Sequence, residues 1–149
     1  MRVSALVAAG LLVLGSAAQA HVTVDPKEAM PGDTQQYTLR VPTEGNSSTV
    51  SVELAVPADV KIEPSKDGKY EIKQADGRTV VAWKVNIPAG KSENVKFTAT
   101  NPDKDGELLW RVVQNFADGS KTAWIEPAGS KQPAPVTKIV SEQYLSPAN

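Results

Sequence analysis

The sequence of 149 residues contains no cysteine and a single histidine, His21. Without cysteine the chain can form neither a disulfide nor a thiolate ligand, which excludes blue-copper sites and cysteine nucleophiles. A single histidine excludes every metal centre that needs two imidazole ligands. A serine–histidine–aspartate triad would have to use His21, near the start of the chain, and no glycine-rich phosphate loop is present. We therefore expect a protein that is not an enzyme.

The sequence also lacks a large excess of charge of either sign and, after residue 20, a long apolar run. The formal net charge is −1 and the charged residues are dispersed, which gives no electrostatic basis for binding nucleic acid. After residue 20 no apolar run approaches the ~18 residues that a membrane-spanning helix needs. We therefore expect no membrane span in the mature chain.

The first twenty residues read as a signal peptide. Met1 and Arg2 form a short positive start, residues 5–15 are apolar, and residues 18–20 (Ala-Gln-Ala) make a small-x-small cleavage site. Cleavage after Ala20 would leave His21 as the first residue of the mature protein. We expect the mature protein to be periplasmic or secreted.

Cleavage at this position would change the chemistry of His21. The free α-amine and the imidazole Nδ1 of one terminal histidine can close a six-membered chelate ring on a metal, whereas an amide nitrogen in the uncut chain cannot. Amine and imidazole nitrogens suit Cu(II). A histidine at this position can also arise by chance, so the residue alone leaves metal binding open.

The rest of the chain alternates apolar and polar residues in short runs that end at proline, glycine or aspartate. Such runs predict half-buried strands, and no segment after residue 20 has a helical period. The runs cover residues 22–25, 34–41, 49–56, 70–74, 78–87, 92–100, 107–116, 120–126 and 136–140. This pattern predicts an all-β, antiparallel β-sandwich over residues 21–140, followed by a flexible tail at 141–149.

The run at residues 49–56 contains the most interesting carboxylate. Val50, Val52, Leu54 and Val56 share one predicted face, and Glu53 lies on the other between small residues. Glu53 is therefore expected to be accessible, either as a metal ligand or as an ordinary solvated carboxylate.

Several motifs resemble the YcnI-type bacterial copper-binding domain. They are His-Val-Thr-Val-Asp-Pro at 21–26, Tyr-Thr-Leu-Arg-Val-Pro at 37–42, Val-Glu-Leu-Ala-Val-Pro at 52–57, and Trp-Arg-Val-Val-Gln at 110–114 followed by Asp118-Gly119 and Trp124. Each motif is short, but they occur in the family's order and cover residues 21–140.

The resemblance implies an immunoglobulin-, fibronectin- or cupredoxin-like sandwich that binds Cu(II). On this pattern His21 supplies the amine and Nδ1, Glu53 supplies an oxygen, and Trp124 lies close by. Because an indole N–H can only donate, Trp124 would shield the metal rather than ligate it, and Gln114 is a weaker candidate for orienting Glu53. The implied function is to hold copper for sequestration, trafficking or delivery to a membrane transporter or another acceptor.

Two alternatives stay open at this point. A β-sandwich of the cell envelope could bind a protein partner through an exposed edge without any metal. A copper site with one histidine and open positions could also activate oxygen, although the sequence shows no signature of a substrate groove.

Overall fold

The computed structural model describes residues 20–141. The predicted signal peptide, apart from Ala20, and the predicted tail, apart from Ser141, lie outside these residues. Within them the regular structure consists of twelve strands and no helix, so nothing there could cross a membrane as a helix. The strands are β1 (Thr23–Asp25), β2 (Glu28–Ala29), β3 (Thr34–Pro42), β4 (Thr49–Ala55), β5 (Lys61–Ile62), β6 (Tyr70–Ala75), β7 (Arg78–Ile87), β8 (Ser92–Thr100), β9 (Gly106–Leu109), β10 (Arg111–Phe116), β11 (Lys121–Trp124) and β12 (Val136–Ile139).

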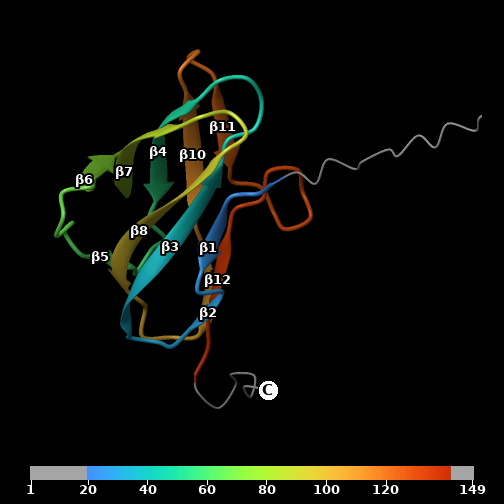
Figure 1. Cartoon of the computed structure of the whole chain (residues 1–149). Coiled ribbons are helices and arrows are strands. Elements are labelled where there is room, and N and C mark those ends of the chain that lie inside the picture. The colour runs from blue at the N-terminus through green and yellow to red at the C-terminus, as the bar shows by residue number, and fades with distance from the viewer. Residues whose placement is uncertain (1–19, 142–149) are drawn as a thin grey trace, which may run out of the picture.

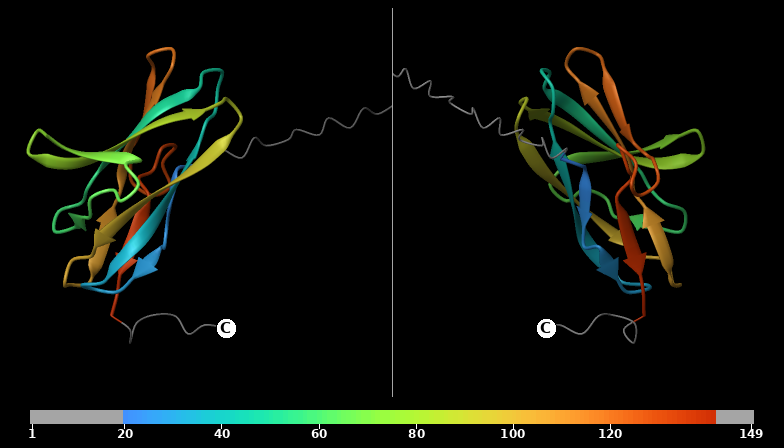
Figure 2. Two further views of the ribbon diagram at one scale, coloured as in Figure 1. Left: turned by 60° about the vertical axis from the view of Figure 1, so that its left-hand side comes forward. Right: turned by 90° about the vertical axis from the view of Figure 1, so that its right-hand side faces the viewer.

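The strands form two main layers, as predicted (Figures 1 and 2). One layer is a five-stranded sheet in the order β11-β10-β4-β7-β6, and the other is a four-stranded sheet in the order β1-β3-β8-β5. A smaller sheet, β2-β12-β9, joins the start of the described chain to its end. Strand pairs are antiparallel except β2 with β12.

Alternation along the strands builds the core between the layers. In β3 the side chains of Tyr37, Leu39 and Val41 are fully buried, whereas Arg40 between them is exposed. β4 contributes Val52 and Leu54 in the same way. Side chains at every second position of a strand share a face, so the two sheets meet on their apolar faces.

Aromatic rings fill the centre of this core. Tyr37 lies 5.0 Å from Trp110 and 5.4 Å from Phe97 between ring centroids, and Trp83 lies 5.9 Å from Phe97. Trp83 is 3% exposed and Trp110 is 0% exposed. Both tryptophans therefore belong to the core.

The predicted runs at 70–74 and 78–87 pair as a hairpin with a short loop. β6 ends at Ala75 and β7 starts at Arg78, so only Asp76 and Gly77 lie between the paired ends. Their φ angles are +51° and +74°. Positive φ at both central residues is the conformation that a tight two-residue hairpin requires, and aspartate followed by glycine tolerates it.

The run at residues 107–116 was expected to be one strand, and this was wrong. The structure divides it at Trp110 into β9, which pairs with β12, and β10, which pairs with β4. The Trp110 backbone N–H donates to the Pro135 carbonyl, and its indole N–H donates to the Thr137 hydroxyl. These bonds let the chain pass from one sheet to another while its polar groups stay paired.

The expected burial of Val50 was also wrong. The pairing of β4 with β7 shifts register between Thr49 and Ser51, and Val50 is 39% exposed. A bulge of this kind adds one residue to one strand and so breaks the alternation of faces at that point.

Candidate metal centre

The first feature of the site is a pair of rings. His21 is exposed and lies two residues before β1; Val22, between His21 and the strand, is 2% exposed and anchors the chain in the core. The imidazole lies 5.9 Å from the ring of Trp124 between centroids, at an interplanar angle of 60°. β1 is an edge strand of one layer and β11 an edge strand of the other. The two rings therefore meet where the edges of the two sheets come together.

The Trp124 side chain is held by a hydrogen bond to a buried residue of the sandwich. It is 6% exposed, and its Nε1–H donates to Gln114 Oε1 at 3.1 Å. The indole N–H is thus already engaged with a buried acceptor, and the ring presents its carbon atoms to His21. This arrangement suits a wall beside the imidazole, as the sequence predicted for Trp124.

A carboxylate that the sequence reasoning missed lies at the chain start. The backbone N–H of Ala20 donates to Glu44 Oε1 at 2.8 Å. Successive backbone nitrogens are less than about 4 Å apart, so the nitrogen of His21 lies near the same carboxylate. Glu44 is therefore close to the place that the α-amine of His21 would occupy after cleavage.

Strand register explains how Glu44 comes to this position. β1 pairs with β3 antiparallel, with Thr23 opposite Arg40. Continued by three residues, this register sets Ala20 opposite Thr43, next to Glu44. The motif at 37–42 gives no indication of Glu44 by itself, because the sequence does not show which strand pairs with this one.

A small hollow adjoins these groups. It has a volume of about 120 Å³, and its lining residues are Glu44, Gln114, Thr122, Trp124, Lys131 and Gln132. Lys131 and Gln132 belong to the loop between β11 and β12. The hollow therefore brings Glu44 and Trp124 to one place, together with polar side chains.

The structure does not bring Glu53 to this place. Glu53 pairs with Val113 of β10, whereas its neighbour Leu54 pairs with Val112, which in turn pairs with Trp124. Glu53 therefore faces outward, on the side of the sheet opposite Trp124. Its Oε1 lies 3.6 Å from the Lys73 ammonium. Since β10 separates β4 from β11, Glu53 is also about 10 Å from β11 across the sheet.

Gln114 likewise has a different role from the expected one. It is 1% exposed and points into the core, so it does not orient Glu53. Its Oε1 accepts from Trp124, and its Nε2 donates to the Pro42 carbonyl at 2.8 Å and to Thr49 Oγ1 at 2.6 Å.

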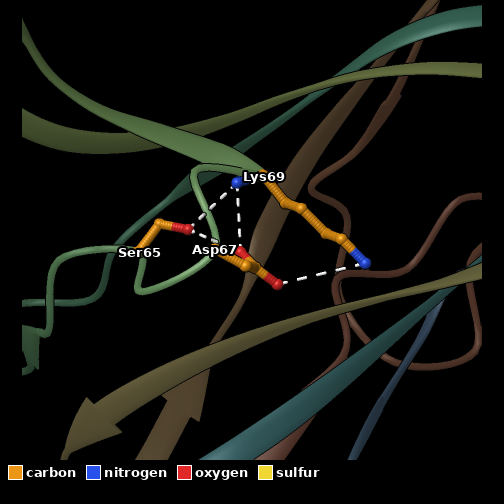
Figure 3. A network of polar contacts seen from close by, with 3 residues as sticks. All are labelled: Ser65, Asp67 and Lys69. Carbon is orange, nitrogen blue, oxygen red and sulfur yellow. Dashed lines mark hydrogen bonds and ion pairs between the residues drawn. The ribbon is translucent and has the colours of Figure 1, made fainter.

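A larger hollow lies elsewhere, and its lining contains no histidine. It is a groove of about 990 Å³ between β8 and the β6–β7 hairpin, bordered by the loop at 63–69. Figure 3 shows that this loop is closed by its own contacts: Ser65 Oγ donates to Asp67, whose carboxylate also accepts from the Lys69 backbone N–H. These hydrogen bonds, together with the nearby Lys69 charge, hold the pKa of the Asp67 carboxyl below its usual value.

Nowhere in residues 20–141 do three histidine, aspartate or glutamate side chains converge as metal ligands. If the chain is cleaved after Ala20, the α-amine released at His21 adds a nitrogen donor next to the imidazole and near the Glu44 carboxylate.

Comparison with solved structures identifies the fold. An uncharacterized protein from Nocardia farcinica with an immunoglobulin-like fold aligns with a TM-score of 0.62 at 21% identity, over 81% of this chain and 99% of that one. A non-cellulosomal cohesin from Archaeoglobus fulgidus aligns with a TM-score of 0.51 at 10% identity, over 83% of this chain and 92% of the cohesin. The predicted all-β sandwich is confirmed, in its immunoglobulin-like form.

Comparison of sequences identifies the family. A family model described as a domain of unknown function, DUF1775, matches residues 21–139. The copper-binding protein CutI of Bacillus subtilis (strain 168) is 34% identical over 143 residues, which are 91% of this chain and 70% of CutI. As its YcnI-type motifs predicted, this chain therefore belongs to the DUF1775 family.

Proposed function

We propose that the mature protein begins at His21 and binds one Cu(II) ion at its N-terminus. The α-amine and Nδ1 of His21 supply two nitrogens, and Glu44 supplies an oxygen. The observation that carries this proposal is the 2.8 Å hydrogen bond from the Ala20 backbone N–H to Glu44, next to an imidazole that faces Trp124. The relative named a copper-binding protein supports the choice of metal.

The donor set fits Cu(II). Imidazole and amine nitrogens and a carboxylate oxygen are borderline-to-hard donors, which suit Cu(II) in a tetragonal geometry. A thiolate, which would favour Cu(I), is not available because the chain has no cysteine. The negative charge of Glu44 offsets part of the charge of the metal.

Signal cleavage is the step that completes this site. In the uncut chain the nitrogen of His21 is an amide, which ligates metals poorly unless it loses its proton. Cutting after Ala20 turns it into an amine and also removes the Ala20 N–H that occupies Glu44 Oε1. The carboxylate then becomes available at the place where the amine appears.

Trp124 limits access to the metal on one side. Its ring faces His21, and its N–H is bound to Gln114, so it covers the imidazole without competing for the metal. An aromatic face also attracts a nearby cation.

The exposed position of His21 suits a carrier. A metal held at the sandwich edge by one residue and one carboxylate is accessible to another protein's ligands. We assign the protein a role on the export side of the membrane, in copper sequestration, trafficking or delivery to a membrane transporter or another acceptor.

The test compares two forms of the same chain. Isothermal titration with Cu(II) is performed on a protein that starts at His21 with a free α-amine and on the same protein with that amine acetylated. We expect acetylation to weaken binding at least ~100-fold, because loss of a metal ligand costs more than the ~10–100-fold lost with an outer partner. Electron paramagnetic resonance should count two nitrogen donors in the first protein and one in the second. Equal, tight binding by both would refute the terminal-amine site.

A further inference from the structure

Gln114 is hydrogen-bonded to both sides of the N-terminal site, the Trp124 ring and the chain segment that leads to Glu44. Its side chain is 1% exposed, and each of its polar atoms is bonded. Oε1 accepts from Trp124 Nε1 at 3.1 Å, while Nε2 donates to the Pro42 carbonyl at 2.8 Å and to Thr49 Oγ1 at 2.6 Å. One buried amide thus holds the ring beside His21 and, at the same time, the chain that leads to Glu44.

The hydrogen bonds continue to the residue next to Glu44. Thr49 Oγ1 lies 2.6 Å from Thr43 Oγ1, and both side chains are buried. The backbone of Thr43 is fixed as well, because its N–H donates to Lys91 and its carbonyl accepts from Gly90, both at 2.8 Å. Residues 42 and 43 are therefore held on both sides immediately before Glu44.

We infer that Gln114 is a positioning residue for copper: it sets the place of the Trp124 ring relative to Glu44, and so the geometry of a metal that it does not touch. This inference rests on the function proposed above. It assigns Gln114 to the copper site, whereas the sequence pattern linked it to Glu53.

The chemistry of this position requires an amide. The side chain must accept one hydrogen bond from an indole and donate two to oxygens at a single buried point. Glutamate could accept but not donate, and lysine could donate but not accept. Methionine has a similar length and could do neither, so Trp124, Pro42 and Thr49 would each lose a buried partner.

The experiment uses the mature protein and a matched control. Gln114→Met removes the amide, and Tyr37→Phe serves as control because it removes the buried hydroxyl that donates to Asn101, beyond the end of β1 that is far from His21. Each variant removes one partner from a buried side-chain hydrogen bond. Cu(II) affinity is measured by titration, and electron paramagnetic resonance reports the geometry of the bound ion.

We expect Gln114→Met to weaken Cu(II) binding by ~10–100-fold, the usual range for partners that orient metal ligands. The g and hyperfine values should change while the number of nitrogen donors stays at two. Tyr37→Phe should bind Cu(II) within about twofold of the wild type, with an unchanged spectrum.

A second pair of variants covers the case in which Gln114→Met does not fold. Thr49→Ser keeps the hydroxyl that Gln114 and Thr43 use, and Thr49→Val removes it. The valine variant should change the spectrum and the serine variant should restore it.

The outcomes separate this inference from the proposed function. If the wild type binds Cu(II) through two nitrogens and both Gln114→Met and Thr49→Val match it in affinity and spectrum, the inference is overturned and the function stands. If the protein starting at His21 binds Cu(II) no better than its α-acetylated form, the function fails and the inference fails with it.

Discussion

The sharpest test of the site compares its two candidate carboxylates, Glu44 and Glu53, one substitution at a time in the mature protein. Glu44→Gln and Glu53→Gln keep the size and shape of the side chain and remove its charge. The two residues differ in place: Glu44 accepts from the Ala20 backbone N–H at 2.8 Å, and Glu53 faces the opposite side of the sheet, 3.6 Å from Lys73.

The positions of Glu44 and Glu53 determine how much Cu(II) affinity each substitution is expected to cost. Partners that only orient a ligand contribute ~10–100-fold to metal affinity, so loss of a direct oxygen donor at Glu44 should cost at least ~10-fold. Tenfold corresponds to about 1.4 kcal/mol of binding free energy. Glu53 is about 10 Å from β11 across two strand spacings. Salt screens exposed charges over about 8 Å at physiological ionic strength, so Glu53→Gln should change the affinity less than about twofold.

The assay is titration of each protein with Cu(II) in competition with a chelator, at constant pH and physiological salt. Thermal unfolding of the metal-free proteins is the control. Glu53→Gln should lose no more than ~1 kcal/mol of unfolding free energy, because its ion pair with Lys73 is exposed. A large loss of affinity in Glu53→Gln, with wild-type binding in Glu44→Gln, would refute the structural choice and restore the ligand predicted from the sequence.

Three further measurements follow from the structure. Acidification should release copper from the mature protein more steeply than from the same protein with its α-amine acetylated, because two nitrogens rather than one must stay free of protons; titrations at about pH 6 and about pH 8 compare them. Trp124→Phe should lower the unfolding free energy by ~1–3 kcal/mol, since Gln114 Oε1 loses its buried donor, and chemical unfolding of the metal-free protein measures it. Burial raises the pKa of Tyr37 to about 12 against the opposing effect of Asn101. An unfolded tyrosine ionises near ~10, so stability should fall as the pH rises through this window, by up to ~1.4 kcal/mol per pH unit. Urea unfolding at alkaline pH should show this fall reduced in Tyr37→Phe.

Much of the fold followed from the sequence because alternation is a local property. The strands around Tyr37, Leu54 and Trp83 could be read from period-two runs, and their buried faces were predicted correctly apart from Val50. The division of residues 107–116 could not be read in this way. Both halves are extended, and only the hydrogen bonds of Trp110 to Pro135 and Thr137 show that they belong to different sheets.

The candidate site was harder to predict for a related reason. The face of Glu53 was predicted correctly, but whether that face looks toward His21 depends on strand order, which alternation does not encode. Glu44 lies in a polar loop with no periodic signal, and it reaches the chain start only through the register of β1 on β3. Local pattern identified the type of residue, and long-range pairing decided which carboxylate lies beside the histidine.

The pairing of β2 with β12 affects the stage of folding at which the proposed metal centre can form. Lys138 N–H donates to the Lys27 carbonyl at 2.8 Å, and the Thr137 hydroxyl donates to the Pro26 carbonyl, 111 positions earlier in the chain. The segment that follows His21 is thus held by the last strand of the described residues. Closing so long a loop is slow compared with forming a local hairpin. A chain in which β12 has not yet paired would therefore hold His21 loosely, and on the function proposed above copper binding would follow closure of the domain.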